Sequence, residues 1–401
     1  MSSSCVRIRA LGARTQARPA VARPAVVVAV SRPPLGRSST QHMPVLLRPG
    51  GSVKELMQPT KRPLPAPLRA TASGDVSADG EAAQPGWKIP AYIVMWYVFN
   101  IVFNIVNKSA LNAFPMPWFI STLQLGASAA FMVFLWVTRL QPVPKVDKGL
   151  FLALLPVGLF HTIGHVSACV SFSQMSVSFT HIVKAAEPVL SVALSGPLLG
   201  ATYPLYVWAS LLPIVAGCSL SAMKEVSFVW GGFQNAMISN LGMVLRNIYS
   251  KKSLVDYKHI DGINLFGLIS IVSLVYCAPA AVIIEGSKWP AAWDAAVASL
   301  GQLPFLQLLA TGGLFYHLYN QASYMVLDQG ISPVTFSVGN TMKRVAVVVS
   351  SIMFFKNPVS PLNYAGSAIA IFGTYLYTVA TDKQAEEKRA AAAAAAGTKP
   401  A

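Results

Sequence analysis

Two adjacent cations, Lys343 and Arg344, lie inside a strongly apolar stretch of the sequence, residues 331–355. Lys343 is twelve residues from either end of this stretch, so a helix spanning a bilayer there would place it near the membrane centre. Each such cation costs on the order of 2.5–3.5 kcal/mol to insert. Charged residues at this depth indicate a function, and here the function must need positive charge.

A second charged pair, Lys184 and Glu187, lies in another apolar stretch, residues 175–199. Their i, i+3 spacing places them on one helix face, so we expect Glu187 to pair with Lys184. Pro188 follows directly, and we expect it to bend the helix at that point. No other carboxylate lies at comparable depth, which leaves the Lys-Arg pair without counter-ions of its own. The missing anion must then come from outside the chain.

The ligand that suits three such cations is a tetrahedral dianion. Arg344 offers a planar fork for two oxygens, while the lysines act as point charges, so we predict a site for inorganic phosphate or a phosphate monoester. Polar groups that could contact the rest of a ligand are His161, His165, Thr180, His181, Tyr316, His317, Tyr319, Asn320 and Gln321. His161 and His165 share a helix face, but no suitable third ligand accompanies them, and no metal site is predicted. Arg246 either joins the site or reaches the lipid headgroups.

Charge also predicts a mechanism. At an effective dielectric near 20, two cations about 6 Å apart repel each other by about 2–3 kcal/mol. An empty site should therefore resist closure away from water, whereas a bound dianion neutralises the site and allows closure. A carrier of this kind moves its site from one side of the membrane to the other only when the site is loaded, in both directions. This is strict counter-exchange of phosphate for a phosphorylated metabolite.

The elements that must position these residues are membrane helices. The chain is 54% hydrophobic and only 11% charged, whereas a soluble domain carries about 25% charged residues. Ten apolar segments approach the 17–25 residues that a span needs: 91–111, 115–138, 149–171, 175–199, 203–223, 228–250, 262–284, 303–328, 331–355 and 360–380. The predicted fold class is an all-α membrane protein with ten transmembrane helices. The four cysteines are scattered and predict neither disulfides nor a metal site.

The sequence carries a faint internal repeat. "VSFTHIVKAAEP" and "TFSVGNTMKRVA" align at Lys184 and Lys343, in the fourth segment of each set of five. Because five is odd, the two halves would insert in opposite orientations, a common plan of secondary transporters. Ten spans put both termini on one side. Nine Lys or Arg on that side, against four on the other, predict that the termini face the interior compartment.

The N-terminal region predicts an organellar transit peptide within residues 1–73. Its first 54 residues contain no acid, are rich in Arg, Ser, Ala and Pro, and lack the apolar run of a secretory signal. Composition does not distinguish chloroplast from mitochondrion, and a cytoplasmic disordered tail is the alternative. We expect residues 74–90 to be a linker, 91–380 the transport domain and 381–401 a disordered tail.

Several stretches are long enough to identify a family: "HTIGHVSACVSF", "VSFTHIVKAAEPVLSV", "RNIYSKKSL", "FYHLYNQASYM" and "SPVTFSVGNTMKRVAVVVSSIMFFKNPVSPLN". Together they closely resemble the plastid phosphate translocators of the drug/metabolite transporter superfamily, over about residues 91–380. The resemblance implies ten helices in two inverted five-helix repeats. It also implies exchange of inorganic phosphate for phosphorylated sugars or three-carbon acids across the inner plastid envelope. In a plastid, the interior compartment that the Lys and Arg distribution predicts for both termini is the stroma.

The resemblance further implies roles for individual residues. Lys184, Lys343 and Arg344 would bind the phosphate, and His165, Arg246 and Tyr319 would join Thr180 and His181 in the pocket. The motifs are most similar to the pentose-phosphate and glucose 6-phosphate branch, although triose phosphate or 3-phosphoglycerate is also compatible. The chain departs from the family in two places. Ala168 stands where triose-phosphate and phosphoenolpyruvate members tend to carry a hydroxyl, and Gly330 is one residue more than the usual turn before the ninth span.

We predict no enzyme activity and no cofactor, because no nucleophile or acid/base set is evident. Most of the net charge of +16 lies in residues 1–70, which hold twelve Lys or Arg and one acid. Because the charge belongs mainly to the predicted transit peptide, it gives no reason to expect a nucleic-acid partner. The alternative function is a nucleotide-sugar or proton-coupled metabolite exporter of the same superfamily. Proton coupling would need a titratable membrane carboxylate, and only Glu187 qualifies. Both a monomer and a homodimer remain open.

Overall fold

The computed structural model describes residues 88–397 except residues 224, 258 and 329–332, and in this part of the chain it contains helices and no strand. The helices are α1 (Lys88–Ala113), α2 (Pro117–Val137), α3 (Lys148–Gln174), α4 (Val177–Lys184), α5 (Glu187–Leu199), α6 (Leu205–Ala222), α7 (Trp230–Ser253), η2 (Val255–Tyr257), α8 (Gly262–Glu285), η3 (Gly286–Lys288), α9 (Trp289–Leu300), α10 (Gln302–Asp328), α11 (Pro333–Phe355) and α12 (Pro361–Gly397). The predicted transit peptide, nearly all of the linker and Gly330 lie outside the described residues.

The predicted all-α membrane class is confirmed. A helix occupies each of the ten apolar ranges, and the fourth range is divided into α4 and α5. Among the described residues, six helical segments are long and apolar enough to cross a membrane: Pro90–Ala113, Pro117–Val137, Lys148–Gln174, Val177–Leu199, Leu205–Ala222 and Gly262–Leu300. The count of ten membrane spans therefore stays a prediction.

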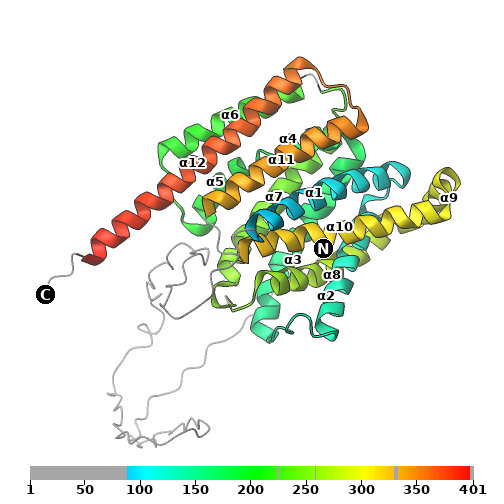
Figure 1. Ribbon diagram of the computed structural model, residues 1–401, viewed down its shortest axis with the longest axis horizontal. Helices are drawn as coiled ribbons and strands as arrows, with labels where there is room; N and C mark the ends of the chain where they lie inside the picture. Colours follow the sequence, from blue (N-terminus) through cyan, green and yellow to red (C-terminus); the bar gives the residue numbers. More distant parts are fainter. Residues whose placement is uncertain (1–87, 224, 258, 329–332, 398–401) are drawn as a thin grey trace, which may run out of the picture. The chain divides into compact units, whose positions relative to one another are not determined.

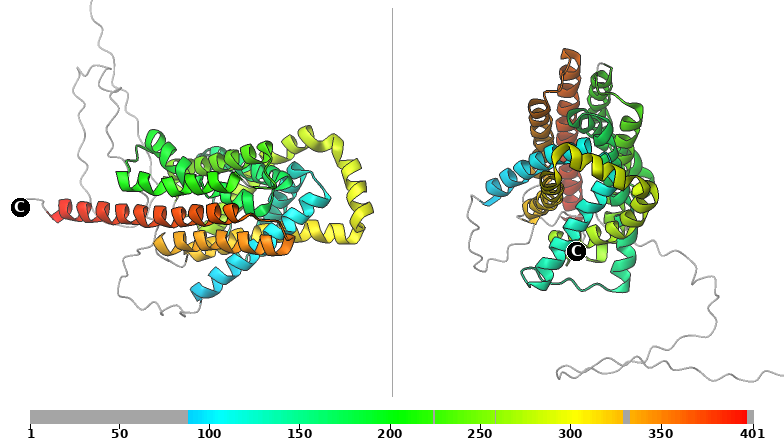
Figure 2. Two further views of the ribbon diagram at one scale, coloured as in Figure 1. Left: turned by 90° about the horizontal axis from the view of Figure 1, so that it is seen from above. Right: turned by 90° about the vertical axis from the view of Figure 1, so that its right-hand side faces the viewer.

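Two helical segments differ from the sequence-based expectation. The short helix α9 was not predicted, and it turns across the end of the bundle where α8 leads into α10 (Figure 2). The last helix, α12, continues to Gly397 through residues expected to form a disordered tail. Residues 390–396 are all Ala, the strongest helix former, so local propensity explains this extension.

Close helix pairs are built on glycine. An added Cβ at Gly217 of α6 would lie 2.2 Å from the backbone nitrogen of Ala370 in α12, and one at Gly242 of α7 would lie 2.6 Å from the nitrogen of Gly164 in α3. Only a residue without a side chain permits such backbone contact. The α6–α12 and α3–α7 pairs are accordingly among the most extensively packed in the molecule, and Figure 1 shows α12 beside α6.

The helix predicted to bend at Pro188 is broken there. It ends as α4 at Lys184, passes through Ala185 and Ala186, and restarts as α5 at Glu187, with Pro188 in the first turn. Proline suits this position because the amide it lacks would have no helical partner in the first turn. The break places Lys184 and Glu187 on separate helices.

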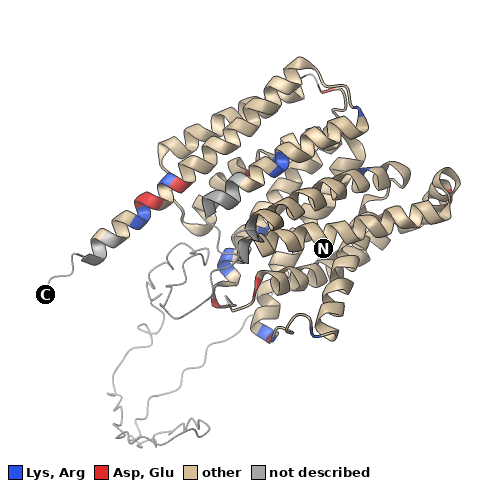
Figure 3. Ribbon diagram, in the orientation of Figure 1, with Lys and Arg blue, Asp and Glu red and all other residues tan. Residues whose placement is uncertain are grey.

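The broken helix is enclosed by other elements. Helix α4 packs against α7 and α11, and α1 packs against α10 and α11. Charged residues are sparse along most of these helices, but basic residues lie midway along α11 (Figure 3).

Candidate functional site

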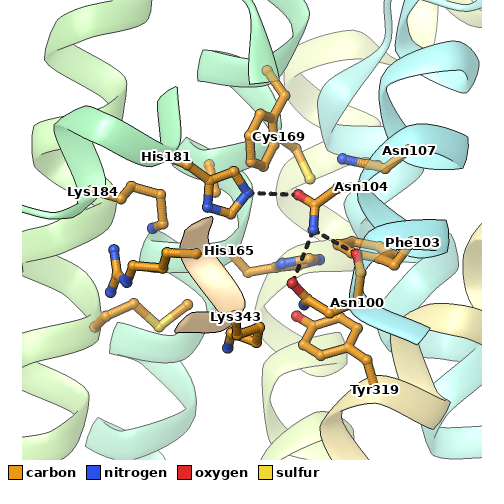
Figure 4. Close-up of a pocket in the computed structure, with 14 residues that line it drawn as sticks. Asn100, Phe103, Asn104, Asn107, His165, Cys169, His181, Lys184, Tyr319 and Lys343 are labelled. Atoms are coloured by element: carbon orange, nitrogen blue, oxygen red, sulfur yellow. Dashed lines mark hydrogen bonds between the residues drawn. The ribbon is translucent and has the colours of Figure 1, made fainter. Parts of the chain in front are cut away.

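A cavity of about 150 Å³ lies between α1, α3, α4, α7, α10 and α11. It is lined by Asn100, Phe103, Asn104, Asn107, His165, Ala168, Cys169, Phe172, His181, Lys184, Met243, Tyr319, Lys343 and Arg344. The three cations predicted to bind phosphate thus meet in one cavity, although they come from helices far apart in the sequence (Figure 4). The volume is smaller than the 300–1,000 Å³ typical of sites for drug-sized ligands, so it favours a small metabolite.

Lys184 is held by α7. Its Nζ donates to Oγ of Ser239 at 2.6 Å, and Ser239 in turn donates to the carbonyl oxygen of Gly164 in α3 at 2.7 Å. The next residue of α7, Asn240, donates from Nδ2 to the carbonyl oxygen of Val183 at 3.0 Å. The end of α4 is therefore fixed beside the cavity through its backbone and through its last side chain.

Lys343 is held by α1. Its Nζ lies 4.5 Å from the ring centroid of Trp96, which is the geometry of a cation–π interaction. One residue further along α1, Tyr97 donates its hydroxyl hydrogen to the carbonyl oxygen of Gly339 at 2.5 Å. These contacts join α1 and α11 next to the cavity and do not neutralise the lysine.

Arg344 forms the ion pair that the sequence predicted for Lys184. Its Nη2 lies 2.9 Å from Oε2 of Glu187. The predicted Lys184–Glu187 pair is therefore wrong, because the helix breaks between these residues and α5 directs the carboxylate toward α11. The expectation that Arg344 has no counter-ion is corrected as well.

Arg344 nevertheless has unused hydrogen-bonding capacity. Its Nη1 is buried and has no hydrogen-bond partner in the described part of the chain. Arg344 also lines a second polar cavity, of about 170 Å³, together with Glu187, Ser191, Asn340 and Thr374. The side chain therefore stands between two cavities, with one arm of its fork committed to Glu187.

The charges of the cavity do not balance. Among the described residues that line it or pair with its lining, Lys184, Lys343 and Arg344 face the single carboxylate of Glu187, which leaves two positive charges. Buried charges that lack partners are costly. A bound dianion would supply the missing charge and acceptors for the free arm of the guanidinium.

Three of the other predicted residues line the cavity. His165 packs against the ring of Tyr316 at 4.6 Å between centroids, and its buried Nε2 has no hydrogen-bond partner within the described ranges. His181 shares a hydrogen bond of 2.8 Å, through Nε2, with Oδ1 of Asn104. Tyr319 lies beside Phe103, with 4.9 Å between ring centroids.

The remaining predicted residues do not line the cavity: Thr180, Arg246, His161, Tyr316, His317, Asn320 and Gln321. Thr180 is buried and shares a hydrogen bond of 3.1 Å with the hydroxyl of Ser171, so it positions the helices. Arg246 donates from Nη1 to Nδ1 of His161 at 3.2 Å. His161 also hydrogen-bonds through Nε2 to the hydroxyl of Tyr316 at 3.1 Å. Arg246 therefore connects with the site through this buried network.

Sequence reasoning missed the contribution of α1. Asn100, Asn104 and Asn107 line the cavity, and Trp96 supports Lys343. A signal was present, because the asparagines recur at i, i+4 and i+7 and so share one face of an otherwise apolar helix.

Replacing Ser239 with Ala should weaken phosphate binding without abolishing it. The substitution removes the hydroxyl that accepts from Lys184, a loss of about 0.5–1.5 kcal/mol for one hydrogen bond. We expect the phosphate concentration for half-maximal exchange to rise about two- to tenfold. Ser210→Ala is a matched control, since Ser210 is a buried serine of α6 that donates within its own helix. An unaltered phosphate affinity in the Ser239 variant would refute this role.

Known proteins with similar sequences match most of the helical region. The family model described as the Triose-phosphate Transporter family matches residues 87–378. The xylulose 5-phosphate/phosphate translocator, chloroplastic, of Arabidopsis thaliana is 59% identical over 291 residues, which cover 72% of this chain and 69% of that protein. The glucose-6-phosphate/phosphate translocator 2, chloroplastic, of the same plant is 49% identical, covering 75% and 77%. The triose phosphate/phosphate translocator, chloroplastic, of Flaveria trinervia is 39% identical, covering 84% and 83%.

Proposed function

This chain belongs to the Triose-phosphate Transporter family, and from that membership we propose that it exchanges inorganic phosphate for phosphorylated metabolites across the inner plastid envelope. The family is one of transporters, so the chain is not assigned a catalytic reaction. Pentose phosphates and glucose 6-phosphate are the proposed main cargo, since the relatives at 59% and 49% identity are named for xylulose 5-phosphate and glucose 6-phosphate. Triose phosphate is a further candidate because relatives at 39% identity are named for it.

The observation that carries the proposal is the unbalanced charge of the cavity. Lys184, Lys343 and Arg344 converge there, Glu187 neutralises one of them, and Nη1 of Arg344 is buried without a partner in the described residues. A phosphate group supplies both the negative charge and the oxygen acceptors that this arrangement lacks. We propose that these three cations bind the phosphate, with His165, His181 and Tyr319 beside it and with Thr180 and Arg246 in supporting positions.

The same imbalance accounts for obligatory exchange. Two cations about 6 Å apart repel by about 2–3 kcal/mol at an effective dielectric near 20, so the empty site opposes closure and a bound dianion permits it. The binding site then returns to the first side of the membrane only when it is loaded. The proton-coupled alternative is less well supported, because Glu187, the carboxylate it would require, is committed to Arg344 at 2.9 Å.

We further propose ten spans in two inverted five-helix repeats, and the pairing of helices supports this arrangement. With α4 and α5 counted as one span and α9 left out, α1, α2, α3, α4/α5 and α6 would correspond to α7, α8, α10, α11 and α12. This correspondence converts the α1–α10 pair into the α7–α3 pair and the α3–α8 pair into the α10–α2 pair, and all four pairs are in contact. The α2–α8, α4–α11 and α6–α12 contacts map onto themselves. Such pairing is expected of two halves related by a pseudo-two-fold axis.

The relatives and the apolar helices make this a multi-pass chloroplast membrane protein. We propose the inner envelope as its membrane, the stroma as the compartment of both termini, and residues 1–73 as a transit peptide. The basic, acid-free N-terminal sequence and the distribution of Lys and Arg between the two sides support these assignments.

Exchange in proteoliposomes tests the proposed function. Vesicles loaded with phosphate should take up labelled phosphate, xylulose 5-phosphate and glucose 6-phosphate, whereas vesicles without an internal counter-substrate should show only background uptake. The cause is the repulsion that holds the empty site open. Uptake at the same rate into empty vesicles would exclude counter-exchange, and no uptake of any phosphorylated compound would exclude the function as a whole.

A further inference from the structure

The amide side chains of α1 form a second polar surface in the cavity. Asn100, Asn104 and Asn107 are 5%, 4% and 1% exposed, and all three line the cavity. They continue the helix face of Trp96, which supports Lys343. Figure 4 shows Asn104 and Asn107 across the cavity from Lys184. The cavity thus has a cationic side, formed by α4 and α11, and a neutral amide side formed by α1.

Hydrogen bonds orient these amides. Asn104 is saturated: its Oδ1 pairs with Nε2 of His181 at 2.8 Å, and its Nδ2 donates to the carbonyl and side-chain oxygens of Asn100 at 2.7 and 3.3 Å. Oδ1 of Asn107 accepts from Nε2 of Gln124 at 2.7 Å. Because the oxygens of Asn100 and Asn107 are engaged, the orientation of both amides is defined.

The amide nitrogens of Asn100 and Asn107 are available to a ligand. Nδ2 of Asn100 donates to no group in the part of the chain that the structure describes, and Nδ2 of Asn107 has only the thiol of Cys169, a weak acceptor, beside it. An unused amide donor in an apolar bundle has a cost. Because the donor lies on the wall of a cavity, an oxygen of a bound ligand can accept from it and remove that cost.

We propose that Asn100 and Asn107 bind the hydroxyl-bearing carbon chain of a phosphorylated sugar while Lys184, Lys343 and Arg344 bind its phosphate. The inference rests on the proposed phosphate exchange and assigns the substrate class of the same site. Neutral N–H donors match hydroxyl and carbonyl oxygens. Inorganic phosphate has no carbon chain and reaches only the cations, so the amides distinguish a sugar phosphate from phosphate itself.

Transport ratios test this assignment. In proteoliposomes loaded with phosphate, Asn100→Leu and Asn107→Leu are compared with the parent for uptake of phosphate, dihydroxyacetone phosphate and xylulose 5-phosphate. Each variant should lower the ratio of xylulose 5-phosphate to phosphate uptake about two- to tenfold, the effect of losing one hydrogen bond in the site. The ratio for dihydroxyacetone phosphate should fall less, because its carbon chain is shorter. Asn235→Leu is the matched control, since Asn235 lies in α7 away from the cavity and donates within its own helix.

The possible outcomes separate the two levels of the proposal. Equal losses of phosphate and sugar-phosphate uptake, or unaltered ratios, would overturn the role of the amides while leaving phosphate exchange in place. Absence of phosphate exchange in the parent would instead overturn the proposed function. Should a leucine variant fail to fold, as judged by size-exclusion chromatography, Asn107→Ala provides the same comparison, because it removes the donor and adds no bulk.

Discussion

Replacing Arg344 with Lys is expected to lower phosphate exchange about ten- to a hundredfold although the positive charge is kept. The guanidinium has two arms, of which Nη2 is bound to Glu187 and Nη1 is buried and unpartnered within the described residues. A lysine has one ammonium group, which cannot take up the same planar geometry toward a carboxylate and a phosphate. The loss of one charge-assisted hydrogen bond, about 1.5–3 kcal/mol, corresponds to the stated range. Initial rates of labelled phosphate exchange in proteoliposomes measure it.

Arg389→Lys is the matched control for this substitution, because Arg389 is exposed in the last part of α12, away from the cavity. Its exchange rate should equal that of the parent. Parental rates in the Arg344 variant would contradict the role assigned to the fork and would leave only charge as its contribution.

Replacing Gly217 with Ala is expected to destabilise the protein by about 1–3 kcal/mol. An added Cβ would lie 2.2 Å from the backbone nitrogen of Ala370 and 2.6 Å from the carbonyl oxygen of Gly366, and backbone atoms cannot move aside as a flexible side chain can. Helices α6 and α12 must then separate, which costs the free energy typical of overpacking. The midpoint of thermal unfolding in detergent, followed by tryptophan fluorescence, should fall by several degrees.

Gly196→Ala separates this packing effect from helix propensity. Gly196 lies in α5, where an added Cβ would come no closer than 3.6 Å to its nearest neighbour. Alanine is favoured over glycine in a helix by up to about 1 kcal/mol, so this variant should be neutral or slightly more stable. A similar stability change in both variants would show that the contact between α6 and α12 is not the cause.

The cations that line the cavity could be predicted because charge in an apolar segment is visible without a structure. Lys184, Lys343 and Arg344 stood out by their cost in a membrane, and the cavity brings the three together. The partner of Glu187 could not be predicted from the sequence alone. Helical spacing favoured Lys184, but the break at Ala185 and Ala186 overrides spacing and places the carboxylate beside α11.

The amides of α1 were missed for a different reason. Asparagine in a membrane helix carries no charge, and it commonly serves helix packing. Whether Asn100 and Asn107 face another helix or a cavity depends on how α1 lies against α10 and α11, which is a tertiary property. Thr180 is the reverse case, since its proximity to Lys184 in sequence suggested the pocket and its hydroxyl pairs with Ser171 instead.

The helices agree with the sequence-based prediction where hydrophobicity defines a segment. They differ from it where local helix propensity decides the structure. All ten predicted ranges contain a helix, and the predicted family is confirmed. The continuation of α12 to Gly397 depends on an alanine tract, which favours a helix but is too short to predict a membrane span. Helix α9 is short, lies between two longer apolar helices, and was hidden in the connection between them.

The break between α4 and α5 gives the site a mechanical joint. Lys184 is the last residue of α4 and Glu187 is the first residue of α5, with two residues between them. A change in the angle between the two helices would move the cation and the carboxylate apart or together without any rotation about a side-chain bond. The local charge of the site is thereby linked to the angle between α4 and α5. A change in this angle would alter the affinity of the site for an anion.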